Sequence, residues 1–134
     1  MKNRIDEKFR ELNELGKKAL IAFITSGDPN QKISKKILGV LKNSKVDLIE
    51  IGFPFSDPMA DGPTIQKSSQ RAIKAGSNLN STLELVESFR IEDKSTPIIL
   101  MGYFNPIFQF GLKKFFVNCR SVGVDGLIVV DLPP

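Results

Sequence analysis

Two hydrophobic patterns alternate along the chain. Short runs of consecutive apolar residues, at residues 19–25 and 46–52, are typical of strands buried on both faces of a parallel sheet. Residues 97–101 and 126–130 form two further runs of the same kind. Between the runs, apolar residues return every three or four positions, which predicts amphipathic helices.

The helices are predicted from apolar stripes and from start signals. A helix is expected to start at Ser81, because Ser81 and Glu84 have the spacing of a capping box. Another is expected over residues 64–75, since Pro63 suits the first turn of a helix. Three stripes indicate the other helices: Ile5, Phe9 and Leu12, ending near Gly16; Ile33, Ile37, Val40 and Leu41; and Leu112, Phe115, Phe116 and Cys119, ending near Gly123.

This order of strands and helices predicts a single α/β domain over residues 1–134. Strands that alternate with helices favour a parallel sheet with right-handed crossovers. No segment after Val130 has a helical pattern that would cover the last strand, so the sheet is expected to have two open edges. Two interpretations stay open. The chain is an incomplete reading of a longer gene, or it pairs its open edges with a second copy in a homodimer.

Composition narrows the class of protein. With 134 residues, 41% of them hydrophobic and 25% charged, the chain is typical of a globular protein of one domain. The longest apolar run, residues 19–24, is too short to span a membrane, and the N-terminus is polar, so we expect neither a membrane segment nor a secretory signal. The single cysteine, Cys119, cannot form an internal disulfide, which favours a cytoplasmic location.

The absence of histidine and the modest net charge exclude several kinds of site. The sequence contains no histidine, which removes histidine-based nucleophilic catalysis and histidine metal sites. The net charge of +4 is mildly basic. Its lysine pairs, at residues 17–18, 35–36 and 113–114, are not interleaved with aromatic residues, so we expect no nucleic-acid surface.

The candidate chemistry lies around the second predicted strand. Alternation places Glu50 on one face of this strand, near its C-terminal end. Burial would raise the pKa of such a carboxyl and suit it to proton transfer; a structural carboxylate bonded to a nearby loop is an equal alternative. Asp57 and Asp61 follow in the next loop, where parallel folds place their sites, although each alone is typical of a turn or a helix cap.

Four segments, in chain order, carry a family resemblance. Residues 48–66 (LIEIGFPFSDPMADGPTIQ) closely resemble the signature segment of the tryptophan synthase alpha subunit family. Residues 23–29 (FITSGDP), 101–106 (MGYFNP) and 122–133 (VGVDGLIVVDLP) are similar to the same family. The resemblance implies an α/β fold of the (β/α)8 TIM-barrel type, of which the chain holds about the first four βα units, a half-barrel preceded by an N-terminal helix.

The resemblance also implies a reaction. It is the aldol-type cleavage of indole-3-glycerol phosphate to indole and glyceraldehyde 3-phosphate, with no metal and no organic cofactor. The indole ring must be protonated at C3, positive charge on its nitrogen must be stabilised, and the side-chain hydroxyl must lose its proton. By family analogy, Glu50 is the general acid-base group and Asp61 holds the indole N–H.

Further residues receive roles from the same resemblance. Thr25 and Asp131 are expected to belong to the orienting set, with Asp131 orienting Asp61 or Thr25 or, equally, capping the end of the fourth strand. Tyr103 is the expected polar contact of the indole pocket, because a buried phenol needs a partner. The residues that match the pocket lining, with ordinary barrel packing as the alternative, are Phe23, Met101, Tyr103, Ile128 and Val130.

The resemblance finally implies a partner subunit and a low activity for this chain alone. The family docks on a pyridoxal-phosphate beta subunit, and the loop with Pro54 and Asp57 resembles the docking loop. The family's phosphate grip lies in the second half of the barrel, so we expect this chain alone to be weakly active or inactive. Two alternatives remain: a non-catalytic, self-associating half-barrel, and a hard-metal site formed by Glu50, Asp57 and Asp61.

Overall fold

A parallel sheet organises the chain. The computed structural model describes residues 3–132. Its four strands, β1 (Ile21–Thr25), β2 (Leu48–Gly52), β3 (Ile98–Gly102) and β4 (Gly126–Val129), are all parallel and lie side by side in chain order. This is the sheet that the apolar runs predict, and it corresponds to half of a (β/α)8 barrel.

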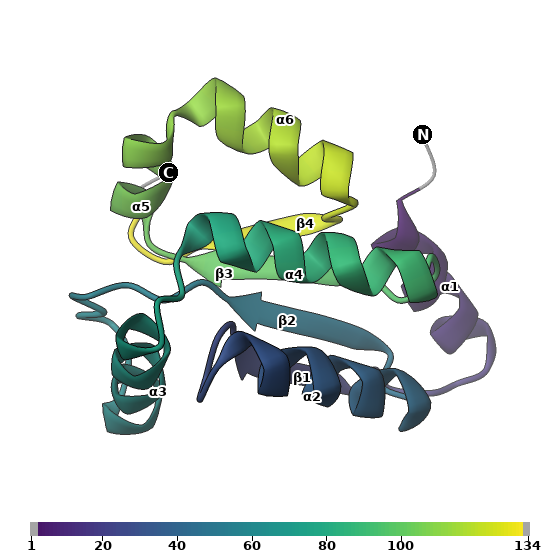
Figure 1. Ribbon diagram of the computed structural model, residues 1–134. Helices are drawn as coiled ribbons and strands as arrows, with labels where there is room; N and C mark the ends of the chain where they lie inside the picture. Colours follow the sequence, from purple (N-terminus) through teal and green to yellow (C-terminus); the bar gives the residue numbers. More distant parts are fainter. Residues whose placement is uncertain (1–2, 133–134) are drawn as a thin grey trace.

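Six helices accompany the sheet. They are α1 (Arg4–Glu14), α2 (Gln31–Asn43), α3 (Pro63–Lys74), α4 (Leu79–Glu92), α5 (Phe104–Phe110) and α6 (Leu112–Val122). Figure 1 shows α2, α4 and α6 as a layer in front of the sheet, with α4 packed between the other two. Helix α1 lies at the N-terminal end of the strands, while α3 and α5 lie at the opposite end. Among the described residues, no helix is long and apolar enough to cross a membrane.

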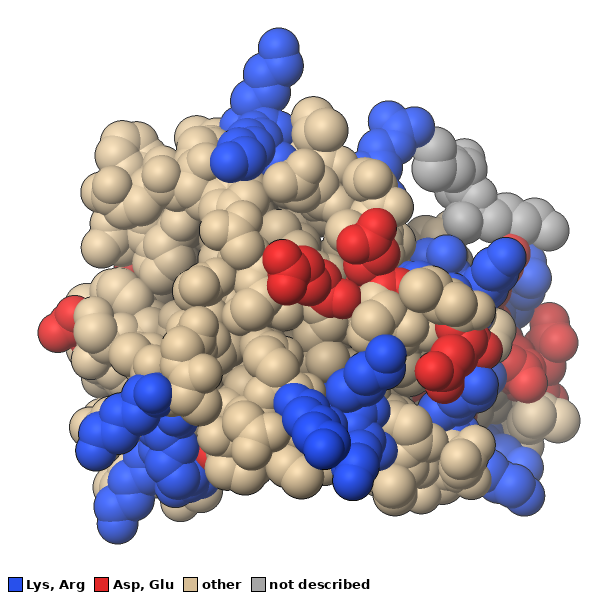
Figure 2. All heavy atoms as spheres, in the orientation of Figure 1, with Lys and Arg blue, Asp and Glu red and all other residues tan. Residues whose placement is uncertain are grey.

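The hydrophobic core fills the space between the sheet and this helical layer. Ile49, Ile51, Ile98 and Leu100, on the same face of the two central strands, are fully buried there. The helices contribute Leu38 from α2, Val86 and Phe89 from α4, and Phe115 from α6. On the outer surface of this layer, basic side chains gather over α2 and α3 and acidic ones over α4 (Figure 2).

The other face of the sheet is open. The register aligns Phe23 with Glu50 and Ile99, and aligns Thr25 with Gly52 and Met101. Aligned residues of parallel strands point to the same side, so these six share one face.

The edge strands differ from the prediction. Only β2 and β3 have neighbours on both sides, and burial on both faces is wrong for β1 and β4. Ile21 is 46% exposed and Ile128 is 43% exposed, because no element among the described residues covers them.

Several helix predictions also need correction. On α2, Val40 points to solvent and Leu38 is the buried residue, and on α6 Phe116 is exposed beside the buried Phe115. Each of the two predicted stripes includes one residue, Val40 on α2 and Phe116 on α6, that lies just outside the helix face that meets the sheet. The N-cap of α4 is Asn78, with Ser81 as its reciprocal third residue. Helix α5 was not predicted, because its seven residues are too few for a periodic pattern.

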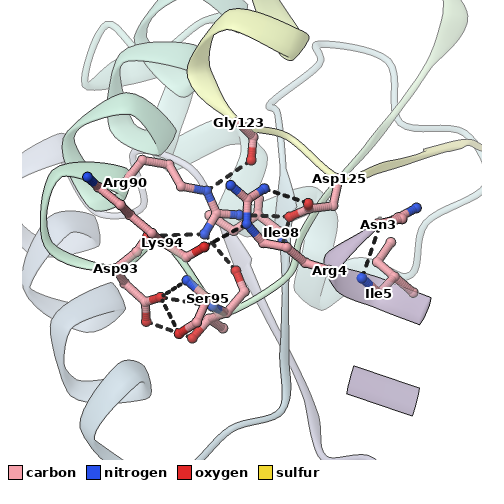
Figure 3. A network of polar contacts seen from close by, with 11 residues as sticks. Asn3, Arg4, Ile5, Arg90, Asp93, Lys94, Ser95, Ile98, Gly123 and Asp125 are labelled. Atoms are coloured by element: carbon pink, nitrogen blue, oxygen red, sulfur yellow. Dashed lines mark hydrogen bonds and ion pairs between the residues drawn. The ribbon is translucent and has the colours of Figure 1, made fainter. Parts of the chain in front are cut away.

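An ion-pair network joins the N-terminal ends of the strands (Figure 3). The Asp125 carboxylate, 5% exposed, accepts from Arg90 Nη2 at 2.8 Å, from Arg4 Nη1 at 2.7 Å and from the Ile98 backbone N–H at 2.9 Å. Arg90 also donates to the carbonyl oxygens of Gly123 and Thr96. Because every partner of this buried charge is satisfied, the network fixes α1 and α4 against β3 and β4.

A second carboxylate stabilises the turn between α4 and β3. Asp93 accepts hydrogen bonds from the backbone N–H groups and the hydroxyls of both Ser95 and Thr96, at 2.6 to 3.1 Å. Burial alone would raise the pKa of Asp93, but these four hydrogen bonds outweigh it and lower the pKa to about 2. The folded state therefore holds Asp93 ionised far below its ordinary range.

Stability is accordingly expected to depend on Asp93 at acid pH. Because the folded pKa is depressed, the stabilisation is present above pH 4 and is lost as the pH falls towards 2. Replacing Asp93 by Asn should lower the free energy of unfolding at pH 7 by about 1–3 kcal/mol. Urea unfolding followed by circular dichroism at several pH values measures both effects. The exposed Asp57, replaced by Asn, is the control and should change little. Equal effects in the two variants would contradict this role for Asp93.

Candidate functional site

The site lies at the C-terminal ends of the strands. Glu50 occupies the middle of β2 on the open face of the sheet, level with Phe23 of β1. It is half-buried, and burial raises the pKa of its carboxyl. Among residues 3–132 no hydrogen bond or ion pair holds the carboxylate, so nothing offsets the cost of its charge. The raised pKa makes Glu50 a candidate for proton exchange.

Asp61 is brought over the sheet by the loop that follows β2. Tight turns shape this loop, since the Asp61 N–H donates to the Pro58 carbonyl at 3.0 Å. The loop is also tied to α3, because Gln66 Nε2 donates to the Asp61 carbonyl at 2.9 Å. Pro63 opens this helix, in keeping with the prediction that it suits the first turn, and Gly62 is the N-cap residue.

Tyr103 fixes the Asp61 side chain. Its hydroxyl accepts from the Ala60 backbone N–H at 2.9 Å and donates to Asp61 Oδ2 at 3.1 Å. Burial raises the pKa of the Tyr103 phenol, and the Asp61 carboxylate raises it further, so the phenol stays neutral and remains a donor. The second carboxylate oxygen, Oδ1, makes no hydrogen bond within the described residues and is free to accept one.

A small pocket surrounds this carboxylate. It is lined on the sheet side by Phe23, Thr25 and Met101, which share the open face. On the loop side it is lined by Asp61, Tyr103 and Phe55, whose ring lies 5.3 Å from that of Tyr103. The pocket has a volume of about 10 Å³ and a mixed polar and apolar lining, so a ligand larger than a water molecule can enter only if its walls move.

Two glycines make room for the pocket walls. A Cβ on Gly52 would lie 2.7 Å from the Phe23 ring, and a Cβ on Gly102 would meet the Phe53 ring. Both rings cross the backbone where any other residue would place its side chain. Phe23 therefore leans over Gly52, the residue two positions after Glu50, and closes the pocket on that side.

The predicted residues do not all meet at this pocket. Phe23, Thr25, Asp61, Met101 and Tyr103 line it together. Glu50 lies on the same sheet face, aligned with Phe23, and is not part of the pocket wall. Ile128 is aligned with Met101, but Ile128 and Val130 are exposed and lie outside the pocket.

Thr25 and Asp131 are held by separate contacts. Thr25 Oγ1 and Ser68 Oγ share a hydrogen bond at 2.7 Å, and Ser68 Oγ also lies 2.8 Å from the Ile65 carbonyl oxygen. Asp131 accepts from the Phe104 backbone N–H at 2.7 Å. That is the contact of a strand-end cap, and Asp131 has no hydrogen bond to Asp61 or Thr25.

The loop that contains Pro54 and Asp57 has a buried side and an exposed side. Pro54 is buried, whereas Asp57 is exposed and accepts a hydrogen bond from the Ser56 hydroxyl. A metal site made by Glu50, Asp57 and Asp61 is not formed, because no three potential ligands among the described side chains lie close enough to hold an ion.

Sequence reasoning missed the residues that hold α3 beside the site. Arg71 donates from Nε and Nη2 to the two oxygens of Asp28, each at 2.7 Å, and so ties α3 to the loop after β1. Ser68 and Ser69 are buried on the same helix, and Ser69 lines the pocket. The signal was available in part, because serines on the inward side of an amphipathic helix call for partners.

Comparison with known proteins fits this arrangement. A family model described as "Tryptophan synthase alpha chain" matches residues 9–134. A protein named tryptophan synthase alpha chain from Granulibacter bethesdensis is 55% identical over 131 residues, which cover 98% of this chain and 47% of that protein.

Solved structures agree. The crystal structure of tryptophan synthase subunit alpha from Legionella pneumophila superposes with a TM-score of 0.98 at 43% identity, covering 100% of this chain and 51% of that one. A tryptophan synthase complex from Pyrococcus furiosus gives a TM-score of 0.81 at 45% identity, covering 86% of this chain and 47% of that one. The chain spans about half the length of these relatives. On this evidence, the chain belongs to the tryptophan synthase alpha chain family.

Proposed function

We propose that this chain carries the acid-base half of a lyase site that cleaves indole-3-glycerol phosphate to indole and glyceraldehyde 3-phosphate in tryptophan biosynthesis. The observation that carries the proposal is the Asp61 carboxylate, held by Tyr103 through one oxygen and free at the other, at the edge of the pocket. Family membership supplies the reaction class.

Asp61 has the geometry for the indole nitrogen. The indole ring would lie among Phe23, Met101 and Phe55, with its N–H directed at Asp61 Oδ1. When the ring accepts a proton at C3, positive charge develops on this nitrogen, and the fixed carboxylate stabilises it without having to reorient. Tyr103 then acts as a positioning residue rather than as a contact of the substrate.

Glu50 is the proposed proton-transfer group. Its pKa is raised by burial, so both protonation states are accessible as the reaction proceeds. One proton is delivered to indole C3, and one is removed from the side-chain hydroxyl as the carbon–carbon bond breaks and the aldehyde forms. Glu50 is not part of the pocket wall, and the pocket is too small for an indole ring, so the walls must move when the substrate binds.

A second subunit is the proposed partner. One of the similar solved structures is a tryptophan synthase complex, which supports assembly with a beta subunit. The exposed side of the loop at Asp57 is the proposed contact, with buried Pro54 shaping the loop from within. Neither residue takes part in the chemistry.

The catalytic proposal predicts a clear order of activities. The chain alone should release indole slowly, because remote binding of the phosphate is weak without the second half of a barrel. Joining residues 1–134 to the second half of the Granulibacter relative should raise the rate. In that fusion, replacing Glu50 by Gln or Asp61 by Asn should lower kcat/KM by about 10²–10⁴-fold. Indole release measured by absorbance tests this.

The matched control for these variants is Asp57→Asn, which should leave indole release unchanged in the absence of a beta subunit. The acid limb of the pH profile should lie above pH 4.5 and vanish in Glu50→Gln. Full activity of Glu50→Gln would contradict the assignment, and so would loss of activity on adding a chelator.

The positioning role of Tyr103 predicts a separable effect. Tyr103→Phe keeps the ring but removes the hydroxyl, so Asp61 loses its anchor and the Ala60 N–H loses its acceptor. The expected result is a loss of about 10-fold or more in kcat, with faster hydrogen exchange at the Ala60 amide seen by NMR. Exchange of the Ile51 amide in β2 is the internal control and should not change. Unaltered exchange at Ala60 would show that Tyr103 does not hold the loop.

The unpaired Glu50 carboxylate also predicts a gain in stability when it is removed. Because its folded pKa is raised, the folded state is destabilised as the pH rises above 4.5. Glu50→Gln should therefore increase the free energy of unfolding at pH 7 and have little effect near pH 4. Urea titrations at the two pH values make the comparison. Destabilisation at pH 7 would mean that Glu50 has a partner in the folded protein.

A further inference from the structure

Hydrogen bonds hold Asp61 at three points. Its backbone N–H donates to the Pro58 carbonyl at 3.0 Å, and its carboxylate accepts from the Tyr103 hydroxyl at 3.1 Å. The third bond is at the Asp61 carbonyl oxygen, which accepts from Gln66 Nε2 at 2.9 Å. Among residues 3–132, Gln66 is the only residue that donates to this oxygen.

The bond from Gln66 sets the direction of the Asp61 side chain. The backbone of a residue has two soft dihedral angles, and the position of its carbonyl oxygen depends on the second, ψ. Because Pro58 holds the N–H and Gln66 holds the carbonyl oxygen, both dihedral angles of Asp61 are fixed and its Cβ points in one direction. Tyr103 then fixes the carboxylate at the end of this side chain.

Helix α3 is itself held in place. Ser68 shares a buried hydrogen bond of 2.7 Å with Thr25 at the end of β1. One turn further along the helix, Arg71 binds both carboxylate oxygens of Asp28 at 2.7 Å, and paired bonds of this kind fix orientation as well as distance. Helix α3 therefore links the end of β1 to the loop that carries Asp61.

We propose that Gln66 is a positioning residue for Asp61, through which α3 holds the main chain of this carboxylate while Tyr103 holds its side chain. The role rests on the proposed lyase function, in which Asp61 stabilises charge on the indole nitrogen. A fixed carboxylate does so without reorganisation, and a displacement of about 1 Å can cost up to about 10²-fold in rate. Gln66 is not part of the pocket wall, so it acts through Asp61 and not on the ligand.

Hydrogen exchange measured by NMR tests the hold without an assay of activity. Gln66→Met keeps the length and the helix propensity of the side chain but removes the donor. Exchange at the Asp61 amide should become at least about tenfold faster, because the loop opens more often once its carbonyl is released. Gln70→Met is the matched control and should leave this exchange unchanged, since Gln70 is exposed on the same helix and makes no side-chain hydrogen bond within the described residues.

Two results of this comparison overturn the proposal. One is unchanged exchange at Asp61 in Gln66→Met, and the other is an equal increase in Gln70→Met, which would mean that α3 loosens as a whole. Circular dichroism checks that each variant is folded. Should Gln66→Met fail to fold, the unaltered chain decides. The side-chain N–H protons of Gln66 should exchange at least about tenfold more slowly than those of Gln70, and equal rates contradict the hold.

Kinetics separate the positioning role from the proposed function. In the fusion with the Granulibacter half, Gln66→Met should lower kcat about tenfold and change KM less than about threefold, because the carboxylate is present but less well placed. Full activity of Gln66→Met beside loss of activity in Asp61→Asn overturns the positioning role and leaves the lyase function standing. Full activity of both variants contradicts the lyase function, and the exchange rates alone then decide whether Gln66 holds Asp61.

A double-mutant cycle tests whether α3 carries the support of Arg71 to Asp61. Arg71→Gln releases Asp28 and should speed exchange at the Asp61 amide by a smaller factor than Gln66→Met does. Added to Gln66→Met, it should produce no further change, because the link between α3 and the loop is already broken. Equal increases with and without Gln66 would contradict the part that the proposal gives to α3.

Discussion

The alternation of side chains along four aligned parallel strands is the constraint on which the rest of the structure depends. Residues at odd and even positions point to opposite faces, so packing and chemistry are separated at each step of a strand. In β2, Ile49 and Ile51 enter the core while Glu50, between them, remains on the open face. A slip of one residue would bury this carboxylate under α4 and expose two isoleucines. Packing of the core therefore fixes the register of the strands, and this register places Glu50 on the open face.

Much of this arrangement could be predicted from the sequence. The apolar runs predicted four strands within one or two residues of their bounds, because polar residues or glycines follow the apolar positions of each run. The segment from Glu50 to Asp61 could be singled out as a candidate site through its family resemblance, whereas its polar residues alone are equally typical of structural roles. The same pattern did not show which strands are edges. Ile21 and Ile128 look as apolar as Ile51, and only the three-dimensional order of the strands separates them.

The remaining differences have local causes. Side-chain hydrogen bonds between distant segments, such as Arg71 with Asp28 and Thr25 with Ser68, have no periodic signal and depend on how α3 packs beside β1. At the start of α4, the capping residues could be confused because Asn78 and Ser81 are both good caps. The structure uses them as a reciprocal pair. Tyr103 lines the pocket, and its hydroxyl also donates to the Asp61 carboxylate, a contact between distant segments that no sequence pattern indicates.

The close contact between Gly102 and the Phe53 ring has a consequence for the shape of the pocket in this chain. Even one methyl group at position 102 would overlap the ring, which lies directly against the backbone of β3. The ring would then be displaced, and Tyr103, the next residue along the chain, would move with the altered strand end. The absence of a Cβ at Gly102 thus allows the Phe53 ring to take its place in the pocket wall. Any side chain at position 102 would therefore reshape this pocket from the protein side.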